Sequence, residues 1–133
     1  MGVAVDSTLF IDLARRRPAA VRKMEELDSR PDVKVIPTPV AYEILYGILE
    51  SRSRTQAALF RGWVSHFQVA GLDLVASDRA ATIRAELGRL GRLKGTADIL
   101  TAGIALAGGH TLVTRDADFR QIADATGLLV ESY

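Results

Sequence analysis

Short apolar runs alternate along the chain with longer segments in which apolar residues recur every three or four positions. The short runs have the length of buried strands, and the longer segments have the spacing of helices with one apolar face. Strands that alternate with helices form parallel sheets covered by helices, so the pattern predicts an α/β fold with a central, mostly parallel sheet. The expected strands are residues 3–5, 33–36, 72–75, 111–114 and 128–130.

Helices are expected in the intervening segments, and three of them begin at residues that favour a helix start. Thr38, Ser77 and Thr96 carry hydroxyls that can accept hydrogen bonds from free amides. Pro39 suits a first turn because its missing N–H costs nothing there. The expected helices are residues 9–13, 18 to about 31, 38–50, 55–67, 77–93 and 96 to about 108.

The composition is that of one globular domain spanning residues 1–133. With 48% hydrophobic residues, the chain can bury a single core. It has no cysteine, which excludes disulfides and thiolate zinc sites and is typical of cytoplasmic proteins. The chain begins without a basic leader, and its longest weakly polar segment, 99–109, is too short to span a bilayer. We therefore expect a cytoplasmic protein with no membrane segment.

Four acidic residues lie where the predicted elements end or begin. Asp6 ends the first strand, Asp116 follows the strand at 111–114, and Asp98 lies in the first turn of a predicted helix. Ligands of parallel sheets bind beyond the carboxyl ends of the strands, so these three residues are expected in one crevice. Glu43 borders the apolar stripe of its helix. Each acid taken alone could equally be a cap, a turn or a surface residue.

A crevice of carboxylates would have a defined metal preference. Carboxylates brought together without lysines between them repel each other, so such a cluster needs a cation. The chain lacks cysteine, and its histidines are His66 and His110 alone, so the ligands would be oxygens. Oxygen ligands favour hard ions, which makes Mg²⁺ or Mn²⁺ the expected metal and disfavours zinc.

Four segments carry motifs of a known family: VDSTLFIDL (5–13), TPVAYEILYGI (38–48), GTADILTAGIALAGGHTLVTRDADF (95–119) and GLLV (127–130). The third is the most specific, because an acid, a helix of small residues, Gly-Gly, a strand, Thr and Asp-x-Asp-Phe follow in the family's order. With these segments, the chain resembles the PIN-domain ribonucleases. Within them, it is similar to the toxin component of the virulence-associated type II toxin–antitoxin systems.

The resemblance implies a fold, an activity and partners. The fold is a three-layer α/β/α arrangement that spans residues 1–133 as a single PIN domain. The activity is that of a Mg²⁺- or Mn²⁺-dependent endoribonuclease that acts as a toxin and is inhibited by its cognate antitoxin. The partners are an RNA substrate, a second copy in a homodimer, and the antitoxin in a heterotetramer or a larger complex.

The resemblance also assigns roles to individual residues. We expect a metal-activated water to attack the RNA phosphodiester, with Glu43 holding a metal or orienting that water. The assigned residues are Asp6, Glu43, Asp98 and Asp116 as catalytic acids, Asp6, Asp98, Asp116 and Asp118 as metal ligands, and Thr8 and Thr114 as supporting hydroxyls.

The binding surfaces are expected to be basic and apolar. The net charge is only +1, so RNA binding would depend on local clusters of arginine and lysine that contact phosphates. Solvated helix faces are the alternative role of those clusters. Phe60, Trp63 and Phe67 share one helical face and belong either to the core or to an apolar groove or dimer contact. The candidate RNA-binding residues are Arg15, Arg16, Arg17, Arg89, Arg92 and Lys94.

Three other functions fit parts of the sequence. An aspartate-based phosphatase would also place Asp6 after the first strand, but it needs a second aspartate where this chain has Thr8. A phosphoacceptor receiver domain needs paired acids after the first strand and a lysine after a late strand, and neither is present. A catalytically inactive PIN-like binding scaffold is the third alternative. Ser-His-Asp hydrolysis lacks its nucleophile motif.

Overall fold

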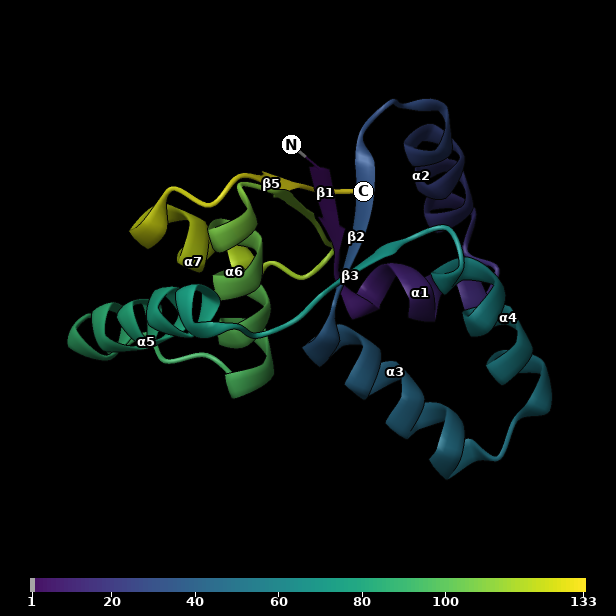
Figure 1. Cartoon of the computed structure of the whole chain (residues 1–133), viewed down its shortest axis with the longest axis horizontal. Helices are drawn as coiled ribbons and strands as arrows, with labels where there is room; N and C mark the ends of the chain where they lie inside the picture. Colours follow the sequence, from purple (N-terminus) through teal and green to yellow (C-terminus); the bar gives the residue numbers. More distant parts are fainter. Residues whose placement is uncertain (1) are drawn as a thin grey trace.

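A computed structural model describes residues 2–133, which form a five-stranded sheet with helices on both faces (Figure 1). The strand order is β3-β2-β1-β4-β5, and every pair of neighbours is parallel. The expected α/β fold with a parallel sheet is thereby confirmed. The strands are β1 (Gly2–Val5), β2 (Val33–Pro37), β3 (Gln68–Ala70), β4 (Thr111–Val113) and β5 (Val130–Glu131).

Seven helices of the described residues make the outer layers, as the three-layer arrangement requires (Figure 1). Helices α1 to α4 cover one face of the sheet, and α5 to α7 cover the other. None of them is long and apolar enough to cross a membrane. Their bounds are α1 (Ser7–Ala14), α2 (Pro18–Ser29), α3 (Thr38–Ser51), α4 (Arg54–Val64), α5 (Leu74–Arg89), α6 (Thr96–Gly108) and α7 (Asp118–Thr126).

The two cores follow from the alternation of side chains along the strands. In β1, Val3 and Val5 join the core beneath α1 to α4, whereas Ala4 joins the core beneath α5 to α7. Phe10 lies in the first core, and its ring centroid is 5.8 Å from that of Phe60. The rings of Trp63 and Phe67 also contact Phe10, so both pack against this core, in which Phe60 is buried, and Phe60 and Trp63 also line an apolar groove.

The strand expected at residues 72–75 is wrong. The edge strand is instead β3, which pairs with β2, and α5 begins at Leu74. The side chain of Asp73 accepts a hydrogen bond from the amide of Ala76 at 2.8 Å and thereby caps the helix. The apolar residues of this segment resemble a buried strand in sequence, but Leu74 is 85% exposed.

The three expected helix caps are also wrong, although the helices exist. Thr38 and Thr96 are the first residues of α3 and α6, and neither helix start has a side-chain cap. Ser77 lies inside α5 because Asp73 caps that helix. Helix α7 has no counterpart among the predicted helices, and its burial of Phe119 and Ile122 completes the core under α5 and α6. Helices α4 and α5 end earlier than expected, at Val64 and Arg89.

Candidate active site

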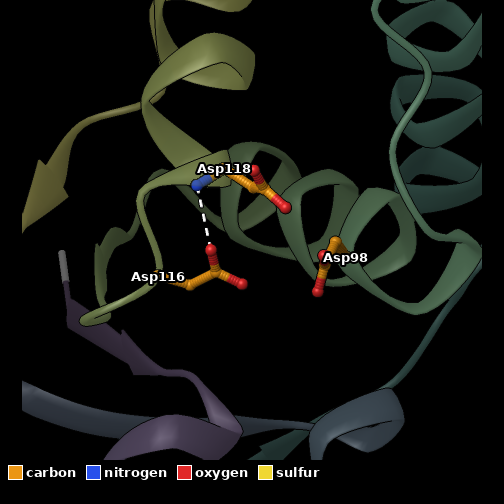
Figure 2. Close-up of side chains that lie close together, drawn as sticks. All are labelled: Asp98, Asp116 and Asp118. Atoms are coloured by element: carbon orange, nitrogen blue, oxygen red, sulfur yellow. Dashed lines mark hydrogen bonds between the residues drawn. The ribbon is translucent and has the colours of Figure 1, made fainter.

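Three carboxylates from two distant segments meet at the carboxyl edge of the sheet (Figure 2). Asp98 lies in the first turn of α6, Asp116 lies in the loop after β4, and Asp118 is the first residue of α7. One oxygen of each lies within 4.8 Å of one oxygen of the others. We call these residues the acidic cluster. The sequence prediction that Asp98 and Asp116 approach each other therefore agrees with the fold.

Local hydrogen bonds set the direction of the loop that carries Asp116. The amide of Asp116 donates to the hydroxyl of Thr114 at 3.0 Å. The amide of Asp118 donates to a carboxylate oxygen of Asp116 at 2.9 Å, as Figure 2 shows. Phe119 follows directly and is fully buried, so it anchors the loop to the core. The loop is thus held on both sides of its two acids.

Asp6 lies next to this loop but outside the acidic cluster. It follows β1, caps α1 with its backbone, and is 3% exposed. Its carboxylate accepts hydrogen bonds from Thr114 at 2.8 Å and from Thr8 at 3.3 Å. Burial raises the pKa of Asp6 and outweighs these hydrogen bonds, and the charge of Asp116 adds to the effect. The two threonines predicted to support the site therefore both contact Asp6.

Repulsion among the acids extends to Asp98 and Glu43. The pKa of Asp98 is raised to about 6, mainly by burial and then by the charges of Asp6, Asp116 and Asp118. Much of Glu43 is exposed on α3, yet partial burial of its carboxyl group, followed by the charges of Asp6 and Asp98, raises its pKa as well. The charges of the other acids thus act on Glu43, although it does not belong to the acidic cluster.

The donor set fits a hard divalent cation. Its donors are carboxylate oxygens, the ligands that Mg²⁺ and Mn²⁺ prefer. Among residues 2–133, the ion pair that reaches the acidic cluster is the one between Lys94 and Asp118, at 3.4 Å. One ammonium group offsets one charge of three, so a bound cation would relieve the remaining repulsion.

An apolar groove of about 270 Å³ opens between α1, α3 and α4. Phe10, Ile48 and Trp63 contribute to its apolar wall, and the charged residues that line it are Arg15 and Glu43. The outer face of α3 continues the apolar surface with large exposed side chains. They are Tyr42, Leu45, Tyr46 and Leu49, with exposed fractions of 69%, 48%, 59% and 75%.

The six candidate RNA-binding residues differ in their surroundings. Arg17 pairs with the buried Asp12 at 3.4 Å, and Arg89 pairs with Glu86. Lys94 is largely buried against Asp118. Within the part of the chain that the structure describes, no acid forms an ion pair with the exposed residues Arg15, Arg16 or Arg92.

Sequence reasoning missed an ion pair beside the site. Arg115 directly precedes Asp116, and its guanidinium donates to both carboxylate oxygens of Asp12, at 2.6 and 3.1 Å. The hydroxyl of Tyr133 donates to the same carboxylate at 3.0 Å. The available signal was an aspartate between two apolar residues of the helix STLFIDLA, where a charge needs a partner.

Similarity to known proteins places this chain in a family. Residues 3–125 match the PIN domain, and the chain belongs to the PIN-domain family. It is 30% identical over 130 residues to the tRNA(fMet)-specific endonuclease VapC of Shigella flexneri, covering 97% of this chain and 96% of that protein. This membership does not favour the phosphatase and receiver-domain alternatives.

Two solved structures with the same fold are VapBC complexes. The DNA-bound VapBC of Salmonella typhimurium matches with a TM-score of 0.82 and 26% identity, covering 99% of this chain and 98% of that one. VapBC2 of Rickettsia felis, bound to a DNA fragment from the promoter, matches with a TM-score of 0.85 and 20% identity, covering 100% of this chain and 99% of that one. The PIN-like fold predicted from the sequence is confirmed.

Proposed function

We propose that this protein is a Mg²⁺- or Mn²⁺-dependent endoribonuclease that acts as the toxin of a toxin–antitoxin pair. The observation that carries the proposal is the acidic cluster of Asp98, Asp116 and Asp118, with Asp6 and Glu43 in the same field. Its similarity to a VapC endonuclease over nearly the whole chain supports the nuclease assignment. The VapBC complexes among its structural relatives support the antitoxin partner.

The acids have two roles in the proposed mechanism. Asp98, Asp116 and Asp118, together with Asp6, would hold the cation, and Thr8 and Thr114 fix the orientation of the Asp6 carboxylate. The cation, when bound, would lower the pKa of a water molecule and offset charge on the phosphate. Glu43 orients the attacking water, and its raised pKa suits a group that accepts a proton.

The binding partners occupy surfaces next to the acids. The exposed Arg15, Arg16 and Arg92 contact RNA phosphates. The antitoxin lies in the apolar groove between α1, α3 and α4, which Glu43 and Arg15 also line, so its binding would obstruct the site. The exposed face of α3 supplies further apolar surface for the antitoxin or a second copy of the chain in the homodimer.

The test of the nuclease assignment is cleavage of end-labelled structured RNA by purified protein. We expect cleavage with Mg²⁺ or Mn²⁺, its loss in EDTA, and products with 5′-phosphate ends. Asp116→Asn should reduce the rate at least about a hundredfold, whereas Asp78→Asn, the same change on the exposed face of α5, should leave it unchanged. Equal rates for the parent and Asp116→Asn would reject the proposal.

A further inference from the structure

Two residues of α1, Thr8 and Asp12, contact Arg115 in the loop that carries Asp116. Arg115 donates two hydrogen bonds from its guanidinium to Asp12, and its amide donates to the hydroxyl of Thr8 at 3.3 Å. Thr8 and Asp12 are one helical turn apart on the same face of α1. The backbone and the side chain of Arg115 are therefore both held by α1, immediately before Asp116.

Asp12 is the fixed end of this connection. It is 1% exposed, and a buried carboxylate is costly unless it is paired and hydrogen-bonded. Burial alone would raise its pKa, but the hydrogen bonds from Arg115 and Tyr133, together with the charges of Arg115 and Arg17, outweigh burial and lower it. Asp12 therefore stays ionised and holds Arg115 in a two-point geometry that a single charge–charge contact would not define.

The same connection reaches the other side of the site. Thr8 also donates to the carboxylate of Asp6, and Thr114, the neighbour of Arg115, donates to the same oxygen. A shift of Arg115 away from α1 would therefore move Asp116 relative to Asp6. Replacing a residue that orients metal ligands typically costs about ten- to a hundredfold in metal affinity or activity.

We propose that Asp12 and Arg115 are positioning residues that hold the Asp116 loop against α1 and so set the separation of Asp116 from Asp6. This inference rests on the proposed metal-dependent function, because it concerns the geometry of that site. The side chain of Arg115 is 49% exposed, so a direct contact with an RNA phosphate is the competing role. The two roles differ in whether cation binding without RNA depends on Arg115.

The test measures Mn²⁺ binding without RNA, from the loss of the free-ion signal in electron paramagnetic resonance. The variants are Arg115→Ala, Arg115→Lys, Asp12→Asn and the double variant Asp12→Asn/Arg115→Ala. The matched control is Arg30→Ala, which removes a guanidinium that contacts both oxygens of Glu131, at 2.9 and 3.0 Å, and whose ion pairs with Glu26, Asp32 and Glu131 involve none of the acids proposed to bind the cation. Circular dichroism and thermal melting show which variants are folded.

We expect Arg115→Ala and Asp12→Asn each to raise the Mn²⁺ dissociation constant about tenfold. The double variant should bind no more weakly than the worse single variant, because both changes break one connection. Arg115→Lys should recover part of the affinity, since it keeps the charge but loses the two-point contact. The Arg30→Ala control should bind Mn²⁺ like the parent even if it melts at a lower temperature.

Other outcomes would overturn the inference in distinguishable ways. Unchanged Mn²⁺ binding in folded Arg115→Lys and Asp12→Asn rejects the positioning role. If Arg115→Ala loses only RNA affinity and its salt dependence while its Mn²⁺ binding is unchanged, Arg115 is a phosphate contact instead. A parent that binds no Mn²⁺ and cleaves no RNA rejects the proposed function, and the inference falls with it.

Discussion

At the scale of single residues, the site is a place where ionisation opposes folding. Burial raises the pKa values of Asp6, Glu43 and Asp98, and the charges of neighbouring acids in the site add to the effect. A carboxyl group whose pKa is higher in the folded state than in the unfolded state destabilises the fold once it is ionised. Such repulsion at neutral pH is expected where carboxylates are arranged for a cation rather than for stability.

Replacing Asp98 should therefore separate stability from function. Without metal at pH 7.5, we expect Asp98→Asn to raise the free energy of unfolding by about 1 kcal/mol, allowing for solvent screening, while abolishing RNA cleavage. Urea unfolding in EDTA measures the first effect. Adding Mn²⁺ should then stabilise the parent by mass action and the variant much less. A variant less stable than the parent in EDTA, with Asp78→Asn neutral, would contradict the repulsion.

The same pKa predicts a direction of pH dependence. The pKa of Asp98 is 3.8 in the unfolded reference and about 6 in the folded protein, so the folded state binds more protons between these values. Stability without metal should fall as pH rises from about 4 to about 6 and then level off. Subtracting the Asp98→Asn curve from the parent curve isolates this residue. Mn²⁺ affinity should rise over the upper part of the same pH window. A difference in stability that does not change with pH would exclude the raised pKa.

The acids were largely predictable from the sequence, whereas their supports were not. Asp6, Asp98 and Asp116 stand at the ends of elements, where parallel sheets bring loops together. Asp118 was expected as a metal ligand and lies in the acidic cluster, whereas Asp6 lies beside it. The ion pair of Asp12 with Arg115 joins residues 103 positions apart, and no local pattern encodes such a contact.

At the scale of elements, α5 and α6 pack so closely that only a glycine fits between them. A Cβ atom added at Gly103 would lie 2.8 Å from the carbonyl oxygen of Ala76 and 2.9 Å from the amide nitrogen of Ala80. Backbone atoms cannot rotate away as a long side chain can. Because α6 also carries Asp98, this contact fixes one wall of the site.

Gly103→Ala should therefore destabilise the protein despite the higher helix propensity of alanine. We expect a loss of about 1–3 kcal/mol in the free energy of unfolding, as for other overpacked cores. Gly62→Ala is the matched control, since a Cβ there meets nothing within 4 Å inside α4, and it should be neutral or stabilising. Chemical denaturation of both variants provides the comparison. A neutral Gly103→Ala would mean that α5 and α6 separate easily.

Element boundaries show why periodicity predicted the order of the elements better than their ends. Residues 72–75 have the apolar content of a strand, but the capping bond of Asp73 starts a helix there. Helix α7 is short and mostly polar, so its two buried residues gave too weak a signal. In both cases one hydrogen bond or one tertiary contact decided the outcome against the local pattern.

At the scale of the whole molecule, the site exists only because two layers meet. Glu43 comes from α3 on one face of the sheet, and Asp98 comes from α6 on the other (Figure 1). Asp6 and Asp116 follow β1 and β4, which are neighbours in the sheet. The field of these acids opposes RNA, whose phosphates are also negative. Attraction must come from basic residues, even though the net charge is only +1.

RNA affinity should therefore fall steeply with salt and depend on few arginines. For a catalytically inactive Asp116→Asn background, we expect a linear fall of the logarithm of affinity with that of salt concentration. Adding Arg16→Ala or Arg92→Ala should make the slope shallower by about 0.7 for each lost phosphate contact on single-stranded RNA. Arg79→Ala, which removes an exposed arginine of α5 outside these groups, should leave the slope unchanged. Fluorescence anisotropy between low and physiological salt measures the slope, and equal slopes in all variants would place the RNA on another surface.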